Sequence, residues 1–389
     1  APGRPLSAQP NAGWPERVGD RILYPATPEY FADYVHQFHR AGARIVGGCC
    51  GTTPAHIRAM RRALDAVALQ PAEATAIAPP AEPAPATVTP AGARPTLMAQ
   101  RLARSEFVIG VEMSPPKGLD ASHLVDQAHI LQQAGADVIN VADSPMARMR
   151  MSPWALAYLL QSRLGMETIL HFPTRGRNLL RVQGDLLAAH ALGVRNILVV
   201  MGDPPTIGDY PQASDSVDVA PSGLVRLIKS QFNQGRDPAG TELGQSTSFF
   251  IGVALNPSAD PLERELRALR RKVDAGADFA LTMPVYDAAV LHRFLEKTGP
   301  LPIPLLIGVL PLQNARHARF LHNEVPGITI PPQAIARLER AGNEDSVEGM
   351  RMAEELVHAL RNVAAGIYLI PALGRYGATA EFIRRLREE

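Results

Sequence analysis

Eight short apolar runs alternate with longer amphipathic stretches over most of the chain, and this alternation limits the possible folds. The runs begin at Phe107, Asp137, Glu167, Asn196, Phe249, Asp278, Pro304 and Gly366. Runs that are apolar throughout are typical of strands buried on both faces, as in a parallel sheet. Eight such strands, separated by helices, predict an α/β fold of the (β/α)8 TIM-barrel type.

The stretches between the runs have helical periodicity and end in glycine. Residues 124–137, 179–193 and 263–278 are the clearest, and each has a Gly where a left-handed C-cap is favoured. The segments QAGADVIN and DAGADFAL repeat the order of helix end, turn and next strand. An open, doubly wound sheet is the alternative, but no G-x-G-x-x-G motif follows the first run to support a nucleotide-binding unit of that kind.

A low-complexity segment, residues 71–95, divides the chain. It is mostly Ala, Pro, Thr and Glu without any aromatic residue, so it cannot bury enough apolar surface to fold. We therefore predict an N-terminal piece (1–70), a linker (71–96) and a barrel (97–389). Because the sequence does not begin with Met, we expect it to start inside a longer gene product.

Composition excludes several classes of function. The formal net charge of +1 gives no electrostatic basis for binding nucleic acid or an anionic membrane. No apolar run reaches the roughly 18 residues that predict a transmembrane helix. The only cysteines, Cys49 and Cys50, are adjacent and form no disulfide framework, so a cytoplasmic location is expected. The expected partners are small-molecule substrates.

Polar side chains lie at the ends of several predicted strands. Glu112, His171 and Asp203 end or follow the first, third and fourth runs, and Asn256 follows the fifth. In a (β/α)8 barrel the active site lies at the C-terminal ends of the strands. A Glu with a raised pKa acts there as a general acid, while a second carboxylate in another environment stays ionised. The sequence therefore predicts a two-carboxylate site with a His.

Other interpretations remain open at these positions. Asp203 before two prolines is also typical of a strand end or a turn cap, and His171 of a hydrogen-bonded core histidine. Lys272 follows two arginines, a run that a solvated helix face explains equally well. Glycoside hydrolases also use two carboxylates, but only 5% of the residues are aromatic, whereas sugar sites are usually rich in aromatics.

From about Leu97 to the C-terminus the sequence resembles methylenetetrahydrofolate reductase, a flavoprotein with a (β/α)8 barrel. The resemblance lies in the segments GVEMSPPKG, HFPTRGRNLLRVQGDLLAAHALGVRNILVVMGDPP, LRRKVDAGADFALTMPVYD, LIGVLPLQNARHARFLHNEVPGI and GIYLIPALGRYG. It implies FAD at the strand ends and ping-pong hydride transfer, from NAD(P)H to flavin and then to methylenetetrahydrofolate. It leaves open NADH or NADPH as donor, and is compatible with a homo-oligomer.

The resemblance also implies roles for single residues. Glu112 matches the family's general acid, which protonates the folate, and Asp203 matches the aspartate that interacts with folate and tunes the flavin. The implied contacts are with flavin for His171, Gly202, Asn256 and Lys272, and with folate for Arg375.

Two positions depart from the family pattern. Met283 stands where a Gln usually offers its amide to the folate ring, and a thioether cannot replace that two-way hydrogen bonding. Met201 stands where Arg or Thr often precedes the Gly-Asp pair. The alternative function is therefore a flavin-binding barrel with impaired folate turnover.

Residues 9–60 resemble the end of a homocysteine S-methyltransferase, through the segment GGCCGTTPAHI. The resemblance implies that Cys49 and Cys50 are two thiolates of a zinc site that activates homocysteine. The third thiolate comes from an earlier strand, and the chain has no other Cys. We therefore predict an incomplete piece of a second (β/α)8 barrel, with methyl transfer present in the parent protein but absent here. A zinc-dependent methyltransferase acting through these cysteines is the remaining alternative.

Overall fold

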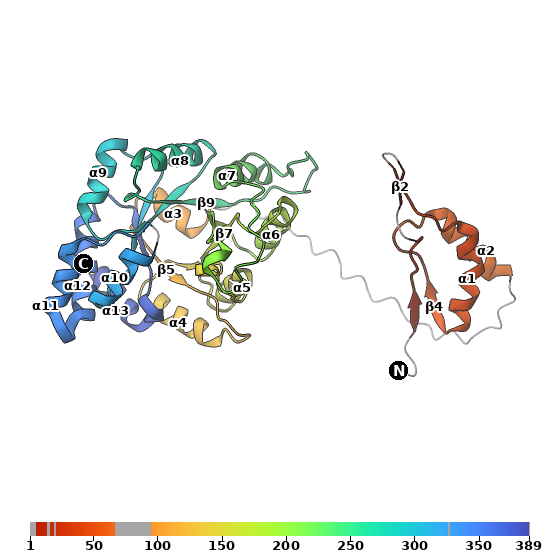
Figure 1. Ribbon diagram of the computed structural model, residues 1–389, viewed down its shortest axis with the longest axis horizontal. Helices are drawn as coiled ribbons and strands as arrows, with labels where there is room; N and C mark the ends of the chain where they lie inside the picture. The colour runs from red at the N-terminus through yellow and green to blue at the C-terminus, as the bar shows by residue number, and fades with distance from the viewer. Residues whose placement is uncertain (1–4, 14–15, 19–20, 67–94, 326, 389) are drawn as a thin grey trace. The chain divides into compact units, whose positions relative to one another are not determined.

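Two compact units make up the described part of the protein, one before and one after residues 67–94 in the sequence (Figure 1). The computed structural model describes residues 5–13, 16–18, 21–66, 95–325 and 327–388. The predicted linker lies almost wholly outside the described residues. The predicted part boundaries at residues 70 and 97 therefore stay predictions.

The larger unit is a closed barrel of eight parallel strands, in the spatial order β10-β11-β12-β5-β6-β7-β8-β9. The strands are β5 (Val108–Met113), β6 (Val138–Val141), β7 (Thr168–Pro173), β8 (Asn196–Val200), β9 (Phe250–Leu255), β10 (Phe279–Pro284), β11 (Leu305–Val309) and β12 (Gly366–Leu369). All eight predicted strands are confirmed. The barrel closes because β12 pairs in parallel with β5, so the alternative of an open sheet is wrong.

Helices surround the barrel (Figure 1). They are α3 (Leu97–Ala103), α4 (Ser122–Gln133), α5 (Pro153–Leu164), α6 (Leu179–Ala191), α7 (Pro221–Ser230), α8 (Leu262–Asp274), α9 (Ala288–Thr298), α10 (Ala315–Glu324), α11 (Pro332–Ala341), α12 (Asp345–Leu360) and α13 (Tyr376–Glu388). The predicted helical stretches correspond to α4, α6 and α8. They are followed by Gly135, Gly193 and Gly276 at φ 104°, 84° and 103°, which confirms the predicted left-handed caps.

Each strand buries both faces, in two separate clusters. Val108 on β5 and Leu281 on β10 belong to one cluster although two strands separate β5 from β10, so this cluster fills the barrel interior. Ile109, the next residue on β5, belongs to the cluster between strands and helices. Because side chains alternate along a strand, Gly110 and Glu112 continue the inward series of β5. The same alternation places Asn140 and His171 on the inward faces of β6 and β7. On β10 the register shifts between Leu281 and Pro284, and Met283 packs against a separate small cluster that includes Leu312 and Ala318.

The repeated Gly-Ala-Asp motif makes the same contact twice at the start of a strand. Asp137 accepts a hydrogen bond from the Ile109 backbone N–H, and Asp278 accepts one from the Ile251 N–H, both at 2.7 Å. Arg387 pairs with Asp137, and Lys229 pairs with Asp278 at 2.9 Å. The two carboxylates thus tie successive strands together and explain the repeat.

The smaller unit contains a parallel pair of strands and two helices. Its elements are β1 (Leu6–Ala8), β2 (Glu16–Val18), β3 (Arg21–Leu23), α1 (Pro28–Arg40), β4 (Ala43–Val46) and α2 (Pro54–Ala66). β1 pairs in parallel with β4, and β2 pairs with β3 in antiparallel. Its core is small and comprises Ala12, Phe31, Val35 and Met60. In neither unit is a described helix long and apolar enough to cross a membrane.

Candidate active site

Most of the predicted site residues lie at one end of the barrel. Glu112, His171 and Met283 are close to the C-terminal ends of β5, β7 and β10, and Asp203 and Asn256 follow β8 and β9. Because the strands are parallel, all of these ends lie at the same mouth. The common end is the consequence of barrel closure, and it is where (β/α)8 barrels place their chemistry.

Glu112 and Asp203 interact at the mouth. Burial raises the pKa of Glu112 to about 7, and the negative charge of Asp203 acts in the same direction. A carboxyl with that pKa is about half protonated at neutral pH, so it can donate a proton there. The pair therefore places a protonatable acid next to the negative charge of a second carboxylate.

Asp203 also holds a neighbouring backbone segment. Its Oδ2 accepts a hydrogen bond from the Met146 N–H at 2.7 Å. Ser144, Met146 and Ala147 have φ values of 46°, 59° and 50°, which non-glycine residues rarely adopt. Asp209 accepts a second bond from this segment, at the Met149 N–H, at 3.1 Å. Asp203 therefore anchors a strained loop in addition to facing Glu112, a role that its sequence context did not indicate.

His171 is neutral at physiological pH. Burial lowers its pKa to about 4, and its Nε2 has no hydrogen-bond partner among the described residues. The ring centroid lies 6.2 Å from that of Tyr368 in the barrel interior. The alternative of a fully hydrogen-bonded core histidine does not describe this side chain, whose Nε2 is available to a ligand or water.

Gly202 is required by its surroundings. Its φ is 89°, and a Cβ there would lie 2.8 Å from the Pro173 Cβ. Its carbonyl oxygen accepts a hydrogen bond from Arg175 Nε at 3.1 Å. A larger residue would therefore push apart the segments that follow β7 and β8.

Asn256 and Lys272 are linked through Glu265. Lys272 Nζ donates to the Ala254 carbonyl at 2.6 Å and lies 3.9 Å from Glu265. The Asn256 N–H donates to Glu265 at 3.3 Å, and its Nδ2 donates to the Gly327 carbonyl at 3.2 Å. Burial lowers the pKa of Lys272, with Arg271 acting in the same direction and Glu265 opposing it. Lys272 thus lies on the partly buried side of α8, facing the strand, and a solvated helix face does not account for it.

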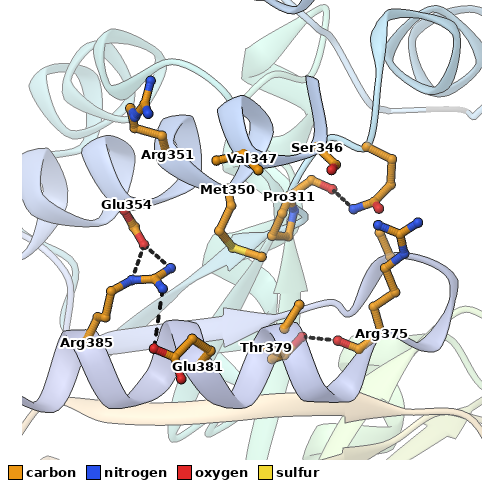
Figure 2. A pocket seen from close by; sticks show the side chains of 13 residues that line it. Pro311, Ser346, Val347, Met350, Arg351, Glu354, Arg375, Thr379, Glu381 and Arg385 are labelled. Atoms are coloured by element: carbon orange, nitrogen blue, oxygen red, sulfur yellow. Dashed lines mark hydrogen bonds and ion pairs between the residues drawn. The ribbon is translucent and has the colours of Figure 1, made fainter. Parts of the chain in front are cut away.

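Met283 packs against the small cluster that includes Leu312 and Ala318, and Arg375 lines a cavity. Met283 is partly buried, and its Cε is 3.7 Å from the place of a Cβ on Gly327. Arg375 lines a cavity of about 400 Å³ between α12, α13 and the segments after β11 and β12. Figure 2 shows the Arg375 side chain rising from the α13 side toward Pro311 and Ser346. Neither Glu112 nor Asp203 lines that cavity.

Two contributors to the mouth were missed by sequence reasoning. Tyr376 is buried, and its pKa is raised to about 12 by burial and by the charge of Glu112, with Arg150 opposing. Arg177 is the second. It pairs with Asp143 at 2.7 Å and Asp185 at 3.2 Å. Tyr376 directly follows Arg375, but nothing in the sequence indicated its contact with Glu112.

The two cysteines do not form a metal centre with other described residues. Their Sγ atoms are 3.8 Å apart and both residues are exposed. His56 is occupied, because its ring nitrogens lie 3.1 Å from the Thr53 backbone N and 3.0 Å from the Ala26 carbonyl. Within the described ranges no group of three His, Cys, Asp or Glu side chains could hold a metal, whereas zinc sites need at least three protein ligands. The described residues therefore do not fit a zinc ion.

Comparison with known proteins identifies the barrel. The family model of methylenetetrahydrofolate reductase matches residues 97–383, which is most of the chain. The chain belongs to the methylenetetrahydrofolate reductase family. The resemblance noted in the sequence is thereby confirmed for the barrel. A second family model, homocysteine S-methyltransferase, matches residues 1–64 and agrees with the predicted N-terminal remnant.

Curated reductases are distant relatives. Methylenetetrahydrofolate reductase 1 of Schizosaccharomyces pombe is 27% identical over 216 residues, covering 54% of this chain and 33% of the relative. Methylenetetrahydrofolate reductase (NADH) 1 of Arabidopsis thaliana is 25% identical, covering 52% and 35%. A probable NADPH-type reductase of Caenorhabditis elegans is 21% identical, covering 71% and 42%. The match thus spans about a third of the length of the first relatives.

A solved structure shares the fold. It is an uncharacterized protein from Clostridium thermocellum, described as binding two copies of 5-methyl-5,6,7,8-tetrahydrofolic acid. The TM-score is 0.53 at 14% identity, and the match covers 75% of this chain and 99% of that one. At this identity the likeness extends to the fold of the reductase barrel only.

Proposed function

We propose that the barrel catalyses the reduction of 5,10-methylenetetrahydrofolate to 5-methyltetrahydrofolate, with NAD(P)H as the hydride source and FAD as cofactor. The observation that carries the proposal is Glu112, an acid with a pKa of about 7 beside Asp203 at the barrel mouth. The family membership of residues 97–383 supplies the reaction class. The folate ligand of the C. thermocellum neighbour is compatible with it.

The residues at the mouth fit a flavin in part. His171 offers an unpartnered Nε2, and Gly202 has no side chain that would block a contact between its backbone and a ligand. Lys272 has N–H groups beyond the one bound to Ala254, which suit a phosphate. The Asn256 amide is bound to Gly327 and would have to exchange that bond for a ligand. A bound flavin would supply the hydride acceptor and donor that no side chain provides.

Glu112 supplies the proton in this proposal. Its buried carboxyl, which is about half protonated at neutral pH, delivers its proton to a folate nitrogen, and this weakens the carbon–nitrogen bond of the five-membered ring. The negative charge of Asp203 favours the protonated form of Glu112. The same charge stabilises the cationic folate that results. The two carboxylates thereby divide acid catalysis and charge stabilisation between them.

The decisive experiment follows the flavin spectrum through the two half-reactions. Purified full-length protein is expected to be yellow, to be bleached by NADH or NADPH, and to recover its colour when methylenetetrahydrofolate is added without oxygen. Colour that never returns with folate would favour the alternative of a flavin-binding barrel impaired in folate turnover. Colourless protein that cannot be reconstituted with FAD would contradict the proposal.

Replacing Met283 by Gln is expected to speed the folate half-reaction about tenfold, the value of one well-placed hydrogen bond. Met283 lies near the mouth end of β10, where we expect a Gln amide to donate to and accept from the folate ring. Stopped-flow reoxidation by methylenetetrahydrofolate measures the effect, and the NADH half-reaction is the internal control. An unchanged or slower reoxidation would show that this position does not contact folate.

We further propose that the parent protein transfers a methyl group to homocysteine. The match of residues 1–64 to the methyltransferase family supports this, because methyl production on folate and methyl transfer to homocysteine are consecutive steps. In this chain the activity is expected to be absent, since Cys49 and Cys50 are its only thiols. Methionine formation from homocysteine by the purified chain would refute that expectation.

A further inference from the structure

A buried amide lies next to Glu112 and has no role in the reaction proposed above. Asn140 on β6 is 0% exposed, and within the described residues neither its Oδ1 nor its Nδ2 has a hydrogen-bond partner. An unsatisfied buried amide is costly, so native proteins normally pair such groups with protein atoms, ligands or water. An apolar side chain of similar size would avoid this cost, and the presence of Asn therefore calls for a function.

Strand register places Asn140 at the level of Glu112. In the parallel pair of β5 and β6, Glu112 is the direct partner of Asn140, and Gly110 is the partner of Val138. Both side chains point into the barrel. The Asn140 Oδ1 lies 2.8 Å from where a Cβ on Gly110 would be. The amide therefore occupies the space left by the missing side chain of Gly110. Gly110 precedes Glu112 by two residues and lies on the same inward face of β5.

We propose that Asn140 is a positioning residue for Glu112: its amide oxygen accepts a hydrogen bond from the protonated carboxyl, directly or through one buried water. This arrangement satisfies the Asn140 oxygen and orients the acidic proton. His171 Nε2 is a further unpartnered atom on the inward side of β7, and a water bound between these groups would have the two or more polar partners that buried water needs. The inference rests on the proposed role of Glu112 as the proton donor.

The other charged and titratable groups around Glu112 act differently. Asp203 raises the pKa of Glu112 through its charge. Tyr376 from α13 interacts with Glu112 and has its own pKa raised to about 12, so it stays neutral, while Arg150 interacts with Tyr376. His171 stays neutral because burial lowers its pKa to about 4. The Asn140 amide carries no titratable proton, so its hydrogen-bonding capacity does not depend on pH. Substituting it therefore measures its own effect on the pKa of Glu112, separately from the effects of the charged neighbours.

The test compares Asn140→Thr with Asn140→Val in the full-length protein. Thr and Val have the same shape, so the two variants leave the same space, but only Thr retains an oxygen that accepts a hydrogen bond. The readout is an infrared pH titration of the Glu112 carboxyl band, identified by its loss in Glu112→Gln. This measurement needs neither folate nor turnover.

Removing the acceptor destabilises the protonated carboxyl, so its pKa should fall. We expect the titration midpoint of the Val variant about one pH unit below that of the Thr variant, since one net hydrogen bond corresponds to about one pKa unit. The pH above which the rate of the folate half-reaction begins to fall should decrease by the same amount. Equal midpoints, or a higher midpoint in Val, would overturn the inference.

A second matched pair guards against misfolding. Asn140→Ser and Asn140→Ala make the same comparison with smaller side chains, and a lower midpoint in Ala than in Ser is expected. The two proposals fail separately. If the wild-type protein does not reduce folate but the midpoints differ as expected, the reductase proposal falls and the Asn140 inference stands. If the protein reduces folate but the midpoints are equal in both pairs, the Asn140 inference falls and the reductase proposal stands.

Discussion

Glu112→Gln is expected to slow the folate half-reaction by at least about 100-fold, the lower range for loss of a general acid, while NADH still reduces the flavin at nearly the wild-type rate. Gln has the size of Glu but carries no transferable proton, so only the step that needs the acid should be affected. Single-turnover reoxidation by methylenetetrahydrofolate measures the loss. A similar loss in both half-reactions would instead indicate a damaged site.

The same residue should govern the pH profile of the folate half-reaction. The pKa of Glu112 is about 7, and in the proposed mechanism the protonated form is the one that reacts. The rate is therefore expected to be constant well below pH 7 and to fall about tenfold per pH unit well above it. Glu106→Gln is the matched control, because Glu106 is a glutamate near the start of β5 that pairs with Arg101 at the surface. That variant should retain both the rate and the pH limit.

Arg177→Met is expected to destabilise the protein by about 3–5 kcal/mol, the cost of leaving buried charges without their partner. Arg177 contacts Asp143 at 2.7 Å and Asp185 at 3.2 Å, and all three side chains are at most 16% exposed. Its guanidinium carbon lies 5.0 Å from the Trp154 ring centroid. Met fills a similar space but carries no charge, so both carboxylates would lose their positively charged partner.

Urea unfolding followed by circular dichroism measures the change in the free energy of unfolding. Arg181→Met is the control, because Arg181 also pairs with Asp185, at 2.6 Å, but is 72% exposed. An exposed partner contributes about 0–1 kcal/mol. If the two variants lost the same stability, the Arg177 cluster would not hold the segments after β6 and β7 together.

The barrel could be predicted from sequence because of where its strands lie. A strand packed on the barrel interior and on the helices needs apolar residues at most positions on both faces, and this pattern is visible in each run. Gly135 and Gly276 similarly precede their strands because the chain there needs positive φ. Such requirements are local, so they appear in the sequence without knowledge of the partners.

The candidate site was only partly predictable. The strand ends identified Glu112 and Asp203 as candidates, because closure of a barrel brings parallel strand ends together. The hydrogen bond that Asp203 accepts from the Met146 N–H and the position of Asn140 next to Gly110 were not predictable. Both depend on strand register and on loop backbone angles, for which a single sequence carries no direct signal.

The sequence by itself therefore determined the fold and the residue types at the mouth, because burial on two faces and helix termination are properties of consecutive residues. Only the tertiary structure decided which of these residues act on one another. The pKa of Glu112 is about 7 because the barrel buries its carboxyl and places Asp203 beside it. Both effects arise between strands that are distant in the chain, and they exist only when the barrel has closed.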